Sequence, residues 1–346
     1  MAMRLSVDSF LVRTPITNSH TNISNTSDTG STTPMTNYSV PFVILDSLIT
    51  TLAISPNFSC LFHILVQLKS DPIIKNWLYL SLVFTTCISS VLGIPIYMLT
   101  KTVGIPPLFQ DAHLDYTLCS SLIAIYLCAS GVLPAMLVCL AIEQTYVILY
   151  PNRSRNRSLR TTRLLTLSYI GVSWSVCAIN ASIPIFHRDN RLIQHGQFTR
   201  CYYEYILTWK SIVPYFICSF YMPLTLLVGL TATIYKGLGQ LQKRNERFPV
   251  LQRMLSARQY RRSSRSVVIL SAFCLVTWMP LAVMRTIEIF NPEFPDKMPG
   301  FVLNTTVLLW HLTVLFNPLY ILYKEYSSGK YKPNNVTLSI TQSLGW

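Results

Sequence analysis

Residues 120–142 read SSLIAIYLCASGVLPAMLVCLAI and contain no charged side chain. This stretch exceeds the roughly 20 apolar residues that an α-helix needs to cross a bilayer. It belongs to a set of seven apolar segments, which span residues 41–68, 76–100, 117–149, 162–186, 206–236, 265–290 and 300–323. None of them alternates apolar and polar residues at period two, as the strands of a membrane β-barrel do. The sequence therefore predicts an all-α membrane protein with a bundle of seven transmembrane helices.

The composition of the whole chain agrees with a membrane protein. Hydrophobic residues make up 51% of the 346 residues and charged residues only 12%, whereas soluble domains carry about 25% charged residues. The mean hydropathy is +0.38. The net charge of +14 raises the alternative of a nucleic-acid-binding protein. We expect no nucleic acid as a partner, because the basic residues lie between the apolar segments and form no separate domain.

Lysine and arginine set the expected orientation of the helices. They concentrate in the C-terminal tail and in the connections after the first, third and fifth segments, notably in a loop expected over 236–265. We expect this face to be cytoplasmic, where anionic membrane lipid attracts it, and the N-terminus to be outside the cell. The chain then divides into an extracellular tail (1–40), a transmembrane domain (41–323) and a cytoplasmic tail (324–346). The expected location is the plasma membrane.

The predicted outer tail carries acceptors for N-glycosylation. Three N-x-S/T triplets begin at Asn22, Asn25 and Asn37, and no apolar core of a cleavable signal peptide is visible there. The chain's nine cysteines form no C-x-x-C or Cys/His cluster, so we expect no metal and no cofactor. No H-E-x-x-H or G-x-S-x-G motif suggests an enzyme.

Short motifs occur in a fixed order along the seven segments. They are Asn57 in SPNFS, Pro95, Trp174, Pro223, TWMP at 277–280 and NPLY at 317–320. Their order and spacing over residues 41–330 resemble the rhodopsin-like (class A) G-protein-coupled receptors. The resemblance implies a receptor for an extracellular ligand that signals to a heterotrimeric G protein, with arrestin as a further partner. It also implies a disulfide between Cys119 and Cys201. Residues 320–331 are expected to form a short amphipathic helix, helix 8, along the membrane.

Several motif residues have a physical role in a moving bundle. The three prolines each remove a backbone hydrogen bond and are expected to kink their helices; they are Pro223, Pro280 and Pro318. Trp278 is expected at the floor of an outer cavity, with plain core packing as the alternative. Asn57 and Asn317 are polar groups at mid-membrane depth, where they need partners or water.

The cytoplasmic end of the third segment departs from the family. Where the family has an acid-Arg-Tyr triplet, this chain has Glu143, Gln144 and Thr145. The family arginine pairs with acids in the resting state and reaches the G protein on activation, and Gln144 has no charge for the first role. The start of the sixth segment, ARQYRRSSRS (257–266), contains no acid either. We therefore expect no salt bridge between the third and sixth helices.

Other switch positions depart as well. Thr86 stands where the family has a sodium-binding aspartate, so we expect sodium modulation to be weak or absent. Thr231 and Ile321 stand where the family has tyrosines, and Tyr320 comes one residue early, about 100° around the helix. We favour a receptor that couples to G proteins with altered, raised basal activity. The alternative is a scavenger or partner receptor that does not signal.

The expected ligand cavity lies in the outer half of the bundle. Tyr126 offers no anion to a protonated amine, and His311 replaces the lysine that binds retinal in opsins, which argues against both classes. The candidate ligand residues are Tyr126, Trp278, Arg285, Glu288, Trp310 and His311. Arg285 and Glu288 share a helix face, so they either pair with each other or leave Arg285 to an acidic ligand group. We expect a peptide or a small polar molecule.

Two further classes stay open. A transporter would need ionisable residues along a path through the membrane. The segments hold few, mainly Asp46, Arg285, Glu288 and His311, all toward the outer end or in the last segment. This distribution fits an outer pocket better than a path. A divergent chemosensory receptor remains the other alternative.

Overall fold

The computed structural model describes residues 40–70, 74–102, 112–150, 153–154, 156–186, 209–247, 251–291 and 299–327. Within these ranges every regular element is a helix, and seven helical spans are long and apolar enough to cross a membrane. The seven-helix bundle predicted from hydropathy is confirmed. The tail with the three glycosylation acceptors lies outside the described residues.

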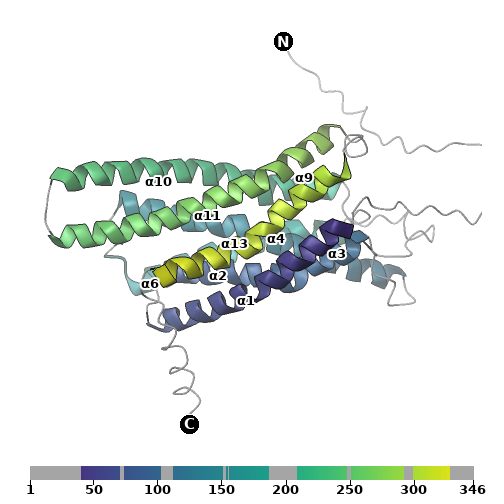
Figure 1. The fold of residues 1–346 in the computed structure, drawn as a ribbon, viewed down its shortest axis with the longest axis horizontal. Coiled ribbons are helices and arrows are strands. Elements are labelled where there is room, and N and C mark those ends of the chain that lie inside the picture. The colour runs from purple at the N-terminus through teal and green to yellow at the C-terminus, as the bar shows by residue number, and fades with distance from the viewer. Residues whose placement is uncertain are drawn as a thin grey trace, which may run out of the picture. The chain divides into compact units, whose positions relative to one another are not determined.

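The seven spans follow one another in chain order (Figure 1). The single-helix spans are the first, third, fourth, sixth and seventh, namely α1 (Val40–Ser70), α4 (Ala112–Leu149), α6 (Leu159–Phe186), α11 (Leu251–Phe290) and α13 (Gly300–Ser327). The second span joins α2 (Ile74–Ile88), the π-helical turn η2 (Ser89–Gly93) and α3 (Ile94–Thr102). The fifth joins α9 (Trp209–Phe216), the π-helical turn η3 (Ile217–Tyr221) and α10 (Met222–Arg247).

The third span, α4, forms the centre of the bundle. It packs against α2, α6, α10 and α11. Of its most apolar stretch 72% is buried, compared with 22% for α6. Large apolar side chains such as Leu167 and Val276 point out of the bundle, as expected where lipid tails, as apolar as leucine, surround it. Residues on α4 can therefore contact most of the helices that carry the predicted site.

The connection between the fifth and sixth spans differs from the expected loop. The α10 helix continues to Arg247 and α11 begins at Leu251, and Figure 1 shows this pair extending past the ends of the other helices. QLQKRNER (240–247) and LQRMLSARQYRR (251–262) consist mainly of good helix formers such as Leu, Gln, Lys and Arg. Most of the residues expected in a loop are therefore helical.

The end of the seventh span also differs from expectation. Residues 320–327, the first part of the expected helix 8, continue α13 to Ser327. No glycine or proline follows Pro318 within α13 to break the helix. The rest of the expected helix, 328–331, lies outside the described residues.

Candidate functional site

Four of the six predicted ligand residues meet in the half of the bundle that contains the start of α1. The ring centroid of Trp310 lies 5.4 Å from that of Tyr126 on α4 and 5.6 Å from that of Trp278 on α11. Phe220 of η3 completes the cluster, 4.8 Å from Trp278. Phe220 was not among the predicted ligand residues, because nothing in the surrounding sequence distinguishes it from the other phenylalanines of the transmembrane segments. These buried rings form an aromatic floor between four spans.

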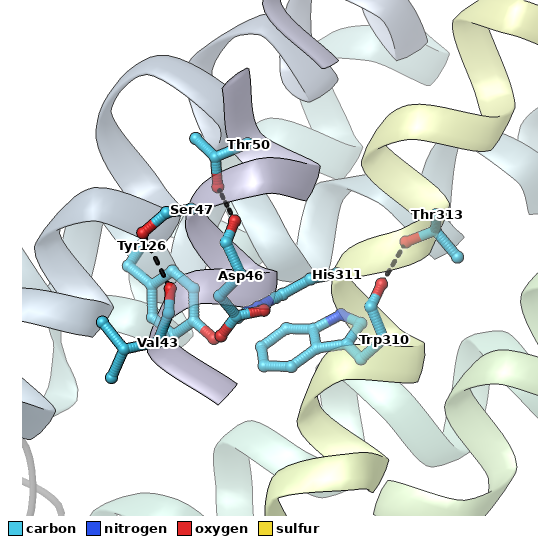
Figure 2. A network of polar contacts seen from close by, with 8 residues as sticks. All are labelled: Val43, Asp46, Ser47, Thr50, Tyr126, Trp310, His311 and Thr313. Atoms are coloured by element: carbon cyan, nitrogen blue, oxygen red, sulfur yellow. Dashed lines mark hydrogen bonds and ion pairs between the residues drawn. The ribbon is translucent and has the colours of Figure 1, made fainter. Parts of the chain in front are cut away.

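A polar network runs beside this floor (Figure 2). The Nδ1 atom of His311 lies 3.0 Å from Oδ1 of Asp46, and its Nε2 atom lies 3.2 Å from the hydroxyl oxygen of Tyr126. Asp46 is 0% exposed and His311 2%. Tyr97 of α3 stacks on Tyr126 at 5.1 Å and meets the imidazole edge-on at 5.5 Å. Since buried polar groups require hydrogen-bonded partners, this network fixes α1, α4 and α13 to one another.

The other two predicted ligand residues lie farther along α11. Arg285 is half-buried, and the side chain of Glu288 lies outside the described part of the structure. Their pairing therefore stays a prediction. Trp278 donates a hydrogen bond from Nε1 to Oγ1 of Thr313, at 3.4 Å, so the aromatic floor is tied to α13 beside Pro280.

Three polar residues occupy the middle of the bundle. Thr86 donates to Oδ1 of Asn57 at 2.5 Å, and Asn57 donates from Nδ2 to the carbonyls of Ala53 and Val314 at 2.8 and 3.2 Å. Asn57 thus joins α1, α2 and α13. Among the described residues, neither side-chain atom of the buried Asn317 has a hydrogen-bond partner.

Gln144 joins α4 to α11 at the predicted inner end of the bundle. Its Nε2 atom donates to Oγ of Ser264 at 2.7 Å, and Ser263 donates to its Oε1 atom at 3.0 Å. Gln144 is 6% exposed and Ser264 is 0% exposed. We call this contact the amide clamp. No salt bridge was expected here, and an uncharged contact joins the two helices instead. Ser263 and Ser264 of RRSSRS (261–266) were not singled out from the sequence.

Glu143 faces the connection between α4 and α6. Both of its carboxylate oxygens accept hydrogen bonds from Nη1 of Arg157, at 2.9 and 3.0 Å. Ser158 caps α6 by accepting a hydrogen bond from the backbone N–H of Thr161 at 3.2 Å, which places Arg157 just before the helix. Burial lowers the pKa of Arg157, but the hydrogen bond to Glu143 and its charge outweigh this and raise the pKa. Sequence reasoning missed Arg157 because it is one of several arginines in the connection.

The chain matches the family described as 7 transmembrane receptor (rhodopsin family) over residues 56–323. The chain belongs to this family. It is therefore a receptor of the G-protein-coupled class, which comprises receptors and not enzymes, and a multi-pass membrane protein. A further similarity is to the adenosine receptor A2b of Gallus gallus, 28% identical over 141 residues. That alignment covers 39% of this chain and 40% of the chicken receptor.

Three other positions at which the chain departs from the family motifs are Tyr320, Ile321 and Thr145. Ile321 is buried, and Tyr320 stacks on Phe316 at 5.7 Å, which in turn stacks on Phe273 of α11 at 3.7 Å. Tyr320 thus lies along the seam between α11 and α13. The hydroxyl of Thr145 donates within its own helix, to the carbonyl of Ala141 at 2.7 Å.

The structure also places the three motif prolines and Cys119. Pro280 and Pro318 lie inside continuous helices, and Pro223 is the second residue of α10, which follows η3. Cys119 is buried near the start of α4 and takes part in a disulfide. Its predicted partner Cys201 lies outside the described residues, so the pairing stays a prediction. The described residues hold no group of three or more His, Cys, Asp or Glu side chains suited to a metal.

Proposed function

We propose that this rhodopsin-family receptor lies in the plasma membrane with its N-terminus outside the cell. It binds an extracellular ligand and signals to a heterotrimeric G protein, with arrestin as a further partner. The family match over residues 56–323 and the seven spans support this role. The excess of lysine and arginine in the connections that follow the first, third and fifth spans supports the orientation.

The network beside the aromatic floor supports a small polar ligand over a peptide. Binding sites for small molecules are mostly apolar and aromatic, with a few polar groups at fixed positions. Tyr126, Trp278 and Trp310 supply the aromatic surfaces, and His311 with Asp46 supplies the polar groups. A peptide remains the second candidate. The name of the chicken relative makes adenosine the first compound to test.

Binding of labelled adenosine to membranes that contain the receptor tests the ligand class. We expect saturable binding to the native chain and its loss in His311→Ala, because the imidazole holds Asp46 and Tyr126 together. Ser47→Ala is the matched control, since the Ser47 hydroxyl is exposed and bonds only within α1. An absence of saturable binding to a well-expressed native chain excludes adenosine.

The amide clamp is the observation that carries the coupling proposal. It joins the inner ends of α4 and α11, so it has to break before the inner half of α11 can swing away from α4. Neutral hydrogen bonds are about half as strong as charge-assisted ones. The resting state is therefore held, but less firmly than a salt bridge would hold it, and we propose raised basal activity.

Ligand-free G-protein activation at equal surface expression tests this proposal. We expect measurable activity from the native chain and more from Gln144→Ala, which loses both hydrogen bonds. Gln144→Arg should lower the activity, because a guanidinium that donates to the Ser264 hydroxyl in place of the amide makes this bond between α4 and α11 charge-assisted. A silent native chain whose signalling is restored by Gln144→Arg would instead identify a scavenger or partner receptor. Silence of all three chains would contradict the raised basal activity.

A further inference from the structure

Three aromatic rings stack across the seam between α11 and α13. The ring centroids of Phe273 on α11 and Phe316 on α13 lie 3.7 Å apart, with 14° between the ring planes. The ring of Tyr320, one turn farther along α13, lies 5.7 Å from that of Phe316 at 13°. We call Phe273, Phe316 and Tyr320 the ring stack. Phe316 is the ring that both others contact.

The ring stack lies beside a proline of each helix. Phe273 comes about two turns before Pro280 on α11, and Phe316 and Tyr320 flank Pro318 on α13. A proline removes one backbone hydrogen bond, so a helix bends most easily there. Phe273 therefore belongs to the half of α11 that contains the amide clamp. Any swing of this half about Pro280 moves the ring of Phe273 relative to that of Phe316.

Contact between the rings stabilises the pair even though lipid surrounds the bundle. All three rings are half-buried, so lipid tails reach their edges and the hydrophobic effect contributes little. Dispersion contributes instead, because carbon atoms attract each other most strongly at about 3.5–4.0 Å. The ring quadrupoles favour an offset pair over a face-to-face one, so dispersion and the packing of the helices hold this arrangement. The contact is lost when the rings separate or slide past each other.

The polar residue beside the stack does not tie the two helices together. Asn317 follows Phe316 directly, and among the described residues neither atom of its amide has a hydrogen-bond partner. The hydrogen bond from Trp278 to Thr313 does join α11 to α13, but it lies close to Pro280, where a swing moves the helix least. The ring stack is therefore a contact between α11 and α13 that a swing disturbs directly.

We propose that the ring stack is a latch of the resting state, which holds the inner half of α11 against α13 and breaks when this half swings out. The inference rests on the proposed coupling to a G protein and adds a second restraint on α11 to the amide clamp. A contact that exists in only one of two states shifts their equilibrium by its whole free energy. Loss of the stack should therefore raise the population of the swung-out state.

Tyr320 has a positioning role in this latch. Its ring lies against that of Phe316 on the same face of α13, and it limits the rotamers of that ring. The tyrosine comes one residue earlier than in the family, and the buried Ile321 follows it. This shift of about 100° around the helix brings the ring onto Phe316 at the seam. The role uses the aromatic ring and not the hydroxyl group.

Ligand-free G-protein activation at equal surface expression tests the latch. Phe273→Leu and Phe316→Leu should each raise the basal activity about fivefold, because leucine is apolar and cannot stack. The double variant should be no more active than either single variant, because both lose the same contact. An increase in the double variant equal to the product of the single increases would overturn the proposal. Gln144→Ala combined with Phe273→Leu should multiply the increases, because the amide clamp is a separate contact.

Phe84→Leu is the matched control. Phe84 is 48% exposed, and its ring centroid lies 6.1 Å from that of Trp174, so it joins α2 to α6 and not α11 to α13. The basal activity of this variant should equal that of the native chain. A rise as large as that of Phe273→Leu would show general loosening of the bundle and overturn the latch.

Two variants of Tyr320 test its positioning role. Tyr320→Phe keeps the ring and should signal like the native chain. Tyr320→Leu should raise the basal activity about twofold, because Phe316 loses its support. Equal effects of the two variants would assign the role to the hydroxyl group and contradict positioning by the ring.

A distance measurement separates the latch from the proposed function. Spin labels at the exposed Arg265 on α11 and Tyr326 on α13 report the distance between the inner ends of these helices, by pulsed electron paramagnetic resonance on the full-length receptor in nanodiscs. Phe273→Leu should raise the share of long distances about fivefold. This rise in a receptor that never activates a G protein would support the latch and contradict the proposed function. An unchanged distribution of distances would overturn the latch alone.

Discussion

At the scale of single residues, the neighbours Gln144 and Glu143 make two separate contacts at one end of α4. Gln144 contacts α11 through both atoms of its amide, and Glu143 contacts Arg157 in the next connection. The contact of Gln144 carries no charge, so salt should not weaken it. The contact of Glu143 with Arg157 is an ion pair, which salt screens. The restraint on α11 and the restraint on the connection can therefore be released separately.

A double-mutant cycle measures the amide clamp directly. Gln144→Ala and Ser264→Ala should each lower the free energy of unfolding by about 1 kcal/mol, and the double variant by about 1 kcal/mol less than their sum. Thermal unfolding of the purified receptor in nanodiscs gives the values. The control pair is Gln144→Ala with Ser130→Ala, whose hydroxyl bonds the carbonyl of Tyr126 within α4. That pair should be additive, and additivity of the first pair would contradict the clamp.

Thr86 leads to a prediction about sodium. Its hydroxyl bonds Asn57 and the carbonyl of Val83, and it offers no negative charge to a cation. The unfolding midpoint of the native chain should be the same in sodium chloride and choline chloride. Thr86→Asp should gain stability in sodium chloride, because a buried carboxylate needs a counter-ion. Thr86→Asn is the neutral control. A sodium-dependent midpoint in the native chain would show that this expectation is wrong.

Single residues were predictable where a motif marks their place, and their partners were not. Tyr126, Trp278 and His311 stand at positions that the family motifs mark, Trp310 directly precedes His311, and the structure brings all four together. The serines of the amide clamp belong to a basic run in which nothing distinguishes them. Their role depends on how α11 is rotated against α4, which is a property of packing and not of local sequence.

At the scale of elements, the close approach of three spans depends on the glycine at position 131 of α4. A Cβ atom added there would lie 3.0 Å from Cβ of Ser219 in η3 and 3.3 Å from Sγ of Cys177 in α6. Small residues allow the backbones of membrane helices to approach closely in this way. The Ser219 Cβ atom is fixed to its backbone, so an added methyl group has to push the spans apart.

Gly131→Ala should therefore lower the free energy of unfolding by about 1–3 kcal/mol through overpacking. Gly171→Ala is the matched control, because nothing lies within 4 Å of a Cβ atom at that exposed position of α6. Alanine there should be neutral or stabilise the helix by up to about 1 kcal/mol. Thermal unfolding of both variants gives the comparison. Equal effects would contradict close packing at Gly131.

Hydropathy predicted the helices correctly in their membrane-spanning parts. All seven spans were predicted, and the start of α13 agrees to the residue with the expected segment. The inner ends of α10 and α11 were taken for a loop, because a polar helix in water carries no apolar signal. The continuation of α13 to Ser327, in place of a separate helix 8, was not predicted for a related reason. Amphipathic composition alone does not say whether a helix bends at the membrane surface.

At the scale of the whole molecule, contacts between distant parts of the chain hold the bundle in register. The α1 and α13 helices, which lie at opposite ends of the sequence, meet through Asp46 with His311 and through Asn57 with the carbonyl of Val314. Asp46 and His311 were noted from the sequence as ionisable groups in the outer half. Their pairing was not predicted, because no periodicity or spacing relates residues so far apart.

The orientation of the bundle yields the last prediction. An excess of lysine and arginine at one end of the spans holds that end in the cytoplasm, so Asn22, Asn25 and Asn37 should be glycosylated outside. Removal of N-glycans by an amidase should shift the native chain on a gel. The triple variant with glutamine at these positions should show no shift. Asn335→Gln should behave like the native chain, because its acceptor lies in the predicted cytoplasmic tail. A shift that depends on Asn335 would reverse the orientation, and the amide clamp would then lie at the outer end of the bundle, where no G protein can reach it.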